Sequence, residues 1–390
     1  MNKVWLGFLA VAVAALQPFA AAQWDESHLN AARGQAVYWN AWGGDERINA
    51  YIDWVATQVD SLYGIELQHV KLSNTADAVA RVRTEVAAGR IRDGGSVDLI
   101  WINGENFAVM KREGLLFGPF AFDLPNFSLV DTAAQPTTIL DFTIPTDGYE
   151  SPWGSAQFNL MVNTEFVPDT FRDISALARW TAANPGRFTY PRPPDFLGST
   201  FLKQVLLETV DADFNQMFAG DSDQLAPVFS FLDALHPTLW RQGRSFPRSG
   251  PALRDMLANF EVDIALSFNP FEAASLVRNG DVPSAVRATG FRSGTIANSH
   301  FVAIPINSNS KAAAMLVADF LLSPIAQARK TNLLYWGDPS VIEYDRLSVD
   351  QRALFNENIR LSTDLGPTLS EPHPSWMEAL EAEWEVRYGS

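Results

Sequence analysis

Aromatic, amide and carboxylate side chains follow directly after two apolar segments in the first third of the chain. Trp42, Gly43 and Gly44 come after the segment 35–41, and Asn103 and Glu105 come after the segment 97–102. Glycine lets a backbone approach a ligand closely, an indole ring offers a flat face to an aromatic or cationic group, and a carboxylate supplies a counter-charge. The pattern predicts recognition of a small polar molecule.

Further candidates for ligand contact share a place at the end of a predicted strand or in an extended segment. They are Trp153, Ser155, Gln157, Phe196, Ser199, Phe268, Asn269, Asn298 and His300, with Trp336 and Asp338 as weaker candidates. Several have a structural alternative: Ser199 also suits a helix N-cap, and His300 can equally satisfy a buried hydrogen bond. Gly43 and Gly44 can equally form a tight turn while Trp42 packs on the core.

The sequence contains no specific pattern for catalysis or metal binding. The sequence has no GxSxG, HExxH or P-loop pattern, and "SNSK" (308–311) suits a helix cap better than a nucleophile. The five histidines are scattered without metal-ligand spacing, and there is no cysteine. We expect no catalytic residue, no metal and no cofactor; a secreted glycoside hydrolase using paired carboxylates stays as the enzyme alternative.

The periodicity of the first hundred residues predicts alternating strands and helices. Residues 35–41, 65–70 and 97–102 have strand character, and two amphipathic stretches that end at Gly64 and Gly89 separate them. Such βαβ units form parallel sheets, which bind ligands beyond the carboxyl ends of their strands. The loops after the strands therefore converge at one edge.

The middle of the chain repeats the strand-loop-helix pattern at 186–208 and 262–280. Two extended crossings, 151–163 and 296–305, carry the chain into this part and back. We expect an α/β fold of two lobes around a hinge and cleft, each lobe a doubly wound, mixed or mostly parallel sheet flanked by helices. The predicted boundaries are 23–151 plus 303–390 for the first lobe, with the C-terminal helices, and 152–302 for the second.

The N-terminus has the pattern of an export signal. Lys3, an apolar run and Ala20, Ala21 and Ala22 predict a signal peptide over 1–22, with cleavage before Gln23. No later apolar stretch reaches 18 residues, and no cysteine can carry a lipid, so we expect a soluble periplasmic protein without a membrane anchor. The net charge of −16 makes nucleic acid an unsuitable partner.

Four longer stretches carry a family resemblance: "YWNAWGGDERINAYIDWV", "VDLIWINGENFAVMKREGLLFGP", "SPWGSAQFNLMVN" and "ANSHFVAIPINSNSKAAAMLVADFLLSP". The chain resembles the extracellular solute-binding proteins of ABC importers, most closely the YnjB-like subgroup, which is distantly similar to thiamine- and iron-binding relatives. The resemblance implies a type II periplasmic binding fold that closes on a small solute. It also implies delivery of that solute to a membrane permease with a cytoplasmic ATPase, by a protein expected to be monomeric.

The same stretches bear on the ligand. Iron-binding relatives use paired tyrosines near the second crossing, where this chain has "ANSHF", which argues against ferric iron. The candidate set is rich in aromatic rings, amides and hydroxyls and lacks an arginine cluster for phosphate or sulfate. A cationic or heteroaromatic solute of the thiamine-like class is the favoured hypothesis, and an oligosaccharide stacked on the tryptophans is the alternative.

Overall fold

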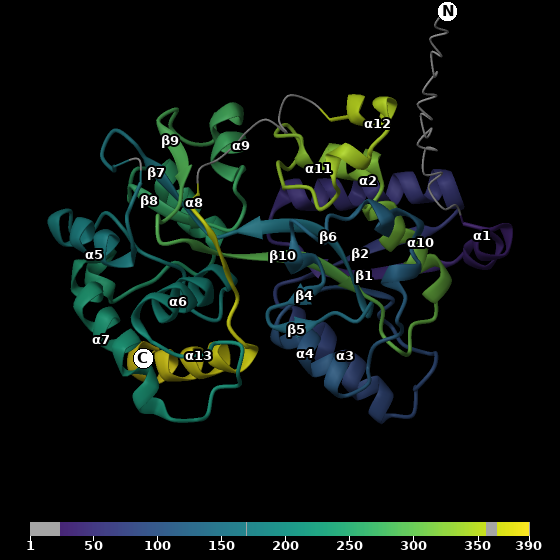
Figure 1. Cartoon of the computed structure of the whole chain (residues 1–390), viewed down its shortest axis with the longest axis horizontal. Helices are drawn as coiled ribbons and strands as arrows, with labels where there is room; N and C mark the ends of the chain where they lie inside the picture. The colour runs from purple at the N-terminus through teal and green to yellow at the C-terminus, as the bar shows by residue number, and fades with distance from the viewer. Residues whose placement is uncertain (1–23, 169, 356–364, 390) are drawn as a thin grey trace, which may run out of the picture.

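The computed structural model describes residues 24–168, 170–355 and 365–389. The predicted signal peptide and its cleavage site lie outside these ranges. Two lobes stand side by side and are joined by extended strands (Figure 1). Each lobe has its own apolar core, and the first lobe contains a further apolar cluster on the α3 and α4 side of its sheet.

The first lobe is built on a six-stranded mixed sheet. Its strands follow the order β11-β10-β3-β1-β2, with β6 on the other side of β10. β1 is parallel to β2 and β3, whereas β10 is antiparallel to β3 and β6, so the predicted βαβ arrangement is confirmed. The strand bounds are β1 Ala36–Trp42, β2 Glu66–Leu72, β3 Leu99–Ile102, β6 Glu150–Gln157, β10 Thr295–Ala303 and β11 Thr368–Ser370.

Helices cover both faces of this sheet, and capping chemistry sets where they begin. The side chains of Asp45 and Asn74 accept hydrogen bonds from the first-turn N–H groups of α2 and α3, and Gly64 ends α2 with a left-handed φ of 68°. A short hairpin, β4 Leu140–Asp141 and β5 Ile144–Pro145, adjoins the start of α4. The helices of this lobe are α1 Glu26–Ala32, α2 Glu46–Tyr63, α3 Thr75–Ala87, α4 Glu105–Arg112, α10 Lys311–Leu321, α11 Pro324–Thr331 and α12 Val349–Ala353.

The second lobe surrounds a three-stranded sheet in the order β8-β7-β9, with both pairs antiparallel. The predicted strand near residue 188 is reduced to one parallel bridge between Phe188 and Ile264. The strands are β7 Asn159–Asn163, β8 Ile264–Ser267 and β9 Val286–Thr289, and the helices are α5 Ile174–Ala183, α6 Phe196–Thr209, α7 Ala226–Leu235, α8 Gly250–Ala258, α9 Glu272–Asn279 and α13 Pro374–Tyr388.

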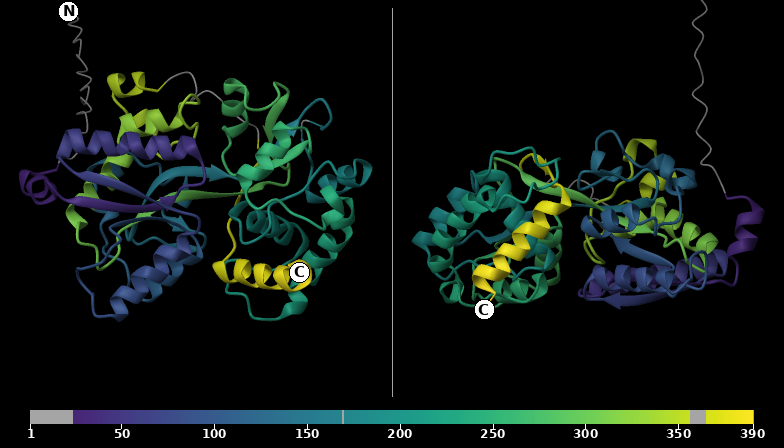
Figure 2. Two further views of the ribbon diagram at one scale, coloured as in Figure 1. Left: turned by 180° about the vertical axis from the view of Figure 1, so that it is seen from behind. Right: turned by 90° about the horizontal axis from the view of Figure 1, so that it is seen from below.

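The C-terminal helix differs from the predicted lobe boundaries, which assigned residues 303–390 to the first lobe. α13 packs against α6 and lies across the second lobe (Figure 2). Trp376, Leu380 and Trp384 recur every four residues, so they form one apolar face, and that face is buried in the second core. β11 pairs with β10, and the chain continues from β11 into α13.

Among the described helices, no single one has both the length and the apolar character needed to cross a membrane. α10 and α11 reach that length and composition only as a pair, with a 57° bend between them.

Candidate functional site

Two groups of side chains bridge the lobes. The first, named here the Lys203 group, consists of Lys203, Glu371, Phe142, Phe196 and Asn298. The second, named the arginine bridge, consists of Asp45, Arg47, Arg254, Glu272 and Ser275. In the Lys203 group the β4–β5 hairpin of the first lobe contacts α6 of the second lobe. In the arginine bridge the start of α2 in the first lobe contacts α8 and α9 of the second lobe.

Lys203 is the centre of the first group. Its ammonium donates to Glu371 Oε2 at 2.6 Å, and the side chains are 0% and 1% exposed. Nζ lies 4.4 Å from the ring centroid of Phe142, in the β4–β5 hairpin, and 5.5 Å from that of Phe196, at the start of α6. Asn298 Nδ2 donates to Glu371 Oε1 at 3.0 Å. Hydrogen bonding and ring contacts together compensate for burying this ammonium.

Glu105 stands at the N-terminus of α4, facing the same region. Burial raises its pKa to about 7, and the nearby Lys203 partly opposes that rise. Ser199, in the first turn of α6, donates a short hydrogen bond to Glu381 of α13. Burial also raises the pKa of Glu381. A half-neutral Glu105 at neutral pH can gain or lose a proton when a charged solute approaches.

The hairpin beside α4 is held by a buried carboxylate. Asp141 Oδ2 accepts a hydrogen bond from the Gly104 N–H at 2.7 Å. Gly104 has a φ of 63°, and a Cβ there would lie 2.7 Å from the Phe142 ring, so only glycine fits. Burial raises the pKa of Asp141 well above its usual range, and Glu105 and Glu371 add to the effect.

The arginine bridge is an ion-pair network between α2, α8 and α9. Arg254 Nη1 lies 2.8 Å from Asp45 Oδ2 and 3.0 Å from Glu272 Oε1. Arg47 donates to Ser275 Oγ at 3.0 Å. Burial alone would raise the pKa of Asp45, but Arg47 and Arg254 hold it below the usual value. This network therefore favours the closed arrangement of the lobes.

A third polar cluster lies beside β6 and β10, the antiparallel pair of strands that leads from the first lobe to the second. His300 Nε2 is 3.2 Å from Asp338 Oδ1, and Lys330 Nζ is 2.7 Å from Asp338 Oδ2. Despite burial, Lys330 and His300 hold the pKa of Asp338 below its usual value. A Cβ on Gly154 would lie 2.6 Å from both Asp338 Oδ2 and His300 Cδ2, so this packing needs glycine.

Close packing in the loop after β1 explains Gly43 and Gly44. A Cβ on Gly44 would lie 2.4 Å from the Trp42 ring, and one on Gly43 would lie 2.6 Å from Lys71 Cβ. Trp42 is half-buried against the first core. Part of the role of these glycines is thus to let the indole fold back over its own loop.

Other predicted site residues have structural partners. Trp153 and Trp336 are 0% and 4% exposed and belong to the first core, where both contact the His300 ring. Phe196 meets the buried Phe268 edge to face at 5.1 Å. Trp153, Trp336 and Phe268 therefore supply shape and almost no exposed surface, whereas Phe196 is 38% exposed.

Of the remaining polar candidates, some already form hydrogen bonds within the protein. Gln157 Nε2 donates to Thr295 Oγ1 at 2.9 Å, and Asn269 Oδ1 accepts from the Phe271 N–H at 2.9 Å. Asn103 and Ser155 are half-buried. The structure therefore brings Glu105, Phe196, Ser199 and Asn298 to the region around Lys203. It brings His300, Trp336 and Asp338 together within the first lobe.

Lys203, Glu371, Phe142 and Arg254 were not predicted. One sequence feature could have indicated Lys203, because it is the lone cation in the apolar run "STFLKQVLLE" of a buried helix. Glu371 and Phe142 come from segments without a periodic pattern, so sequence gives no reason to place them together.

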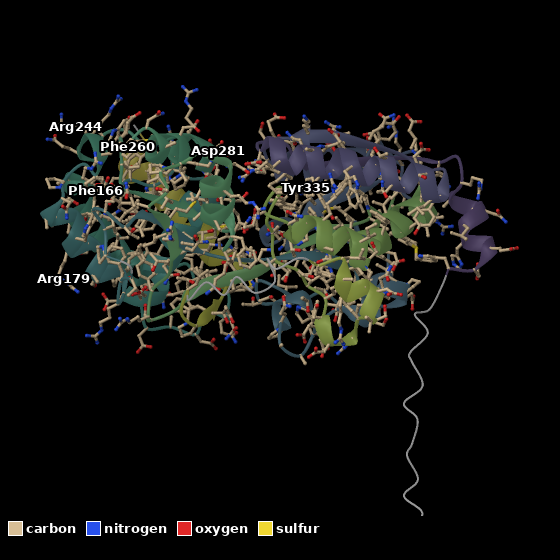
Figure 3. The ribbon with its side chains drawn as sticks, turned by 90° about the horizontal axis from the view of Figure 1, so that it is seen from above. Phe166, Arg179, Arg244, Phe260, Asp281 and Tyr335 are labelled. Carbon is tan, nitrogen blue, oxygen red and sulfur yellow. The ribbon has the colours of Figure 1, made fainter. Side chains whose placement is uncertain are left out.

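Three further observations concern metal binding, a pocket that adjoins the Lys203 group, and the outer end of the second lobe. Within the described residues, no group of three or more His, Cys, Asp or Glu side chains is placed to hold a metal ion. A pocket of about 330 Å³ on the second lobe includes Glu371 and Phe214 in its lining. Figure 3 shows Phe166, Arg179, Arg244 and Phe260 on the end of the second lobe far from the first.

Comparison of the chain with known proteins identifies its family. The family model described as "Bacterial extracellular solute-binding protein" matches residues 54–342. Protein YnjB of Escherichia coli (strain K12) is 45% identical over 374 residues, which are 95% of each chain.

Solved structures share the fold at low identity. AfuA from Actinobacillus pleuropneumoniae, with exogenous fructose-6-phosphate bound, has a TM-score of 0.62 and 14% identity over 91% of this chain and 99% of its own. PotD from Streptococcus pneumoniae, a spermidine/putrescine ABC transporter substrate-binding protein, has a TM-score of 0.61 and 14% identity over 90% and 99%. The two-lobed fold and the resemblance expected from the sequence are confirmed, and the chain belongs to the bacterial extracellular solute-binding proteins.

Proposed function

We propose that this protein is the periplasmic solute-binding component of an ABC importer and that it captures a small organic cation between its lobes. The solute is held without any bond being made or broken. The open form binds it, closure buries it, and the closed monomer delivers it to the membrane permease and its ATPase. The signal peptide predicted over 1–22 accounts for export to the periplasm.

The charge balance around Lys203 carries this proposal. Glu105 and Asp141 come from the first lobe, Glu381 comes from α13 of the second lobe, and Glu371 directly follows β11 in the segment that leads to α13. Burial raises the pKa of all four carboxyl groups, and each lies close enough to the Lys203 ammonium for that charge to oppose the rise. One lysine cannot balance four carboxyl groups, so a positively charged solute completes the charge pairing. Partial protonation of the carboxyl groups serves the same purpose when no solute is bound.

The aromatic candidates support the organic character of the solute. Trp42 and Phe196 are the rings of the predicted set that retain exposed surface, and cations and heteroaromatic rings stack on such faces. Thiamine-like cations and amines both fit this description. Among structural neighbours, the name of PotD gives spermidine and putrescine as the solutes of its transporter.

A ligand screen tests the proposal. The purified protein is heated with diamines, thiamine, amino acids or neutral sugars, and mass spectrometry identifies any compound that co-purifies. We expect organic cations to raise the unfolding temperature, since a ligand at 100 times its dissociation constant adds about 2.7 kcal/mol of stability. Stabilisation by neutral sugars alone would instead establish the oligosaccharide alternative, and turnover of a glycoside would establish the hydrolase.

A further inference from the structure

The ammonium of Lys203 has surroundings typical of a bound alkylammonium ligand. It donates to the Glu371 carboxylate at 2.6 Å and lies 4.4 Å and 5.5 Å from the Phe142 and Phe196 ring centroids. A carboxylate with aromatic faces is a common way for proteins to recognise organic ammonium groups. Here the protein's own side chain occupies the position.

The enclosure exists only while the lobes are together. Phe142 belongs to the hairpin packed on Gly104 of the first lobe, whereas Lys203 and Phe196 belong to α6 of the second. Lys203 is fully buried between them. Opening the lobes therefore separates one aromatic wall from the ammonium and exposes the carboxylate to solvent.

An unused acceptor provides an independent reason to expect a further N–H donor. Asn298 is 3% exposed, and its Oδ1 has no partner among the described residues, although its Nδ2 is bonded to Glu371. Buried acceptors of this kind are costly unless a donor reaches them.

We infer that Phe142, Phe196, Glu371 and Asn298 form a subsite for a primary ammonium group, which Lys203 fills until a solute displaces it. The inference rests on the proposed solute-binding function and narrows the solute to one that carries a primary ammonium. Lys203 then acts as a tethered competitor. It lowers the affinity for weakly binding amines and prevents the carboxylates from being buried without a counter-charge.

Chemical rescue tests the subsite directly. Lys203→Ala removes the atoms of n-propylammonium, so the full-length variant is heated with n-propylammonium chloride, with n-propanol or with NaCl at equal ionic strength. We expect Lys203→Ala to unfold at a lower temperature than wild type and n-propylammonium to restore the loss saturably. Neither n-propanol nor NaCl should do so. If the variant folds only when n-propylammonium is present during expression or refolding, the subsite is equally supported.

A matched control separates an ammonium subsite from simple cavity filling. Lys330 is also fully buried and is paired with Asp338 at 2.7 Å, but both residues belong to the first lobe. Lys330→Ala should show no comparable rescue by n-propylammonium. Equal rescue of the two variants, or rescue of Lys203→Ala by n-propanol to the same extent, would overturn the inference.

A second variant measures the competition. Lys203→Met keeps most of the side-chain volume and removes the charge, and calorimetry compares it with wild type for butane-1,4-diammonium and for butane-1,4-diol. We expect at least a tenfold gain in affinity for the diammonium and none for the diol. Unchanged or weaker diammonium binding would refute the competitor role.

Different results would refute the proposed function and the ammonium subsite. If the wild-type protein retains no small solute of any class, the proposed function is wrong. If it binds a solute, yet n-propylammonium does not rescue Lys203→Ala, only the ammonium subsite is wrong.

Discussion

At the scale of single residues, Glu105 is the group whose charge state is most open to change. It sits half-buried at the start of α4, and burial raises its pKa to about 7. A cationic solute favours the ionised carboxylate, so binding should release a proton when the pH is near or below that pKa. The affinity for the solute should then depend on pH within the physiological range.

We predict that the affinity for an organic cation rises as the pH increases from about 6 to 8 and that Glu105→Gln removes most of this rise. Below the pKa of about 7, Glu105 is largely neutral and offers no charge to the solute; above it, the carboxylate is fully formed. At pH 8 the variant should bind about tenfold more weakly, which corresponds to about 1.4 kcal/mol. Isothermal titration calorimetry at several pH values measures both effects.

Buffers with different ionisation enthalpies give the control for this prediction, because they report proton release directly. A wild-type affinity that stays flat between pH 6 and 8 would show that Glu105 does not sense the solute.

The Trp42 ring permits a second test at this scale. We predict that Trp42→Ala weakens binding of a stacked cation by about 0.5–2 kcal/mol, which is about 2- to 30-fold. The ring also packs over Gly44, so the unfolding temperature of the solute-free variant is measured alongside its affinity. A variant that loses stability and binds the solute normally would show that Trp42 serves only packing.

At the scale of secondary-structure elements, the packing of a polar cluster against the paired strands β6 and β10 requires one small residue. Gly154 opposes His300 across the antiparallel pair, and a side chain there would meet the Lys330 Nζ at 2.9 Å as well as Asp338. His300, Lys330 and Asp338 are linked by hydrogen bonds, so none can move without loss to another. The glycine allows this polar cluster to fit against the strand.

We predict that Gly154→Ala lowers the free energy of unfolding by about 1–3 kcal/mol, because the added methyl overpacks a buried cluster. Urea unfolding followed by tryptophan fluorescence measures the change. Ser155→Ala, one residue along the same strand, removes only a hydroxyl and should stay within about 0.5 kcal/mol of wild type. Equal stability of the Gly154 variant and wild type would mean that the cluster can move aside.

The elements also show how far the sequence could predict the structure. Strand and helix periodicity over the first hundred residues predicted the parallel core of the first lobe, since each pattern reports local burial. Whether α13 joins one lobe or the other depends on which apolar surface receives Trp376 and Trp384, and periodicity carries no such information.

The candidate site was predictable to the same limited extent. Loops after strands led to Glu105, while Asn298 followed from the second crossing. Lys203 and Glu371 are 168 residues apart in sequence and lie on different elements, so their pairing is a property of the tertiary structure.

At the scale of the whole molecule, the contacts between lobes differ in kind. The Lys203 group encloses a fully buried ammonium with rings and a carboxylate. The arginine bridge instead joins side chains that keep 9–19% of their surface exposed. Closure must remain reversible if a solute is to enter and leave. We interpret the arginine bridge as the contact that sets how often the lobes close without a solute, and the Lys203 group as the contact that a solute modifies.

We predict that Arg254→Met shifts the solute-free protein toward the open form. Arg254 bonds Asp45 of the first lobe at 2.8 Å, and a charged hydrogen bond contributes about 1.5–3 kcal/mol. A larger open fraction should appear as a larger radius of gyration in solution scattering. The apparent affinity decreases when the closed fraction decreases, so the variant should also bind the solute more weakly. Arg187→Met is the control, since Arg187 bonds Asp263 at 2.7 Å within the second lobe and should change neither quantity. If both variants scatter as wild type does, the bridge does not hold the lobes together, and closure depends on the Lys203 group alone.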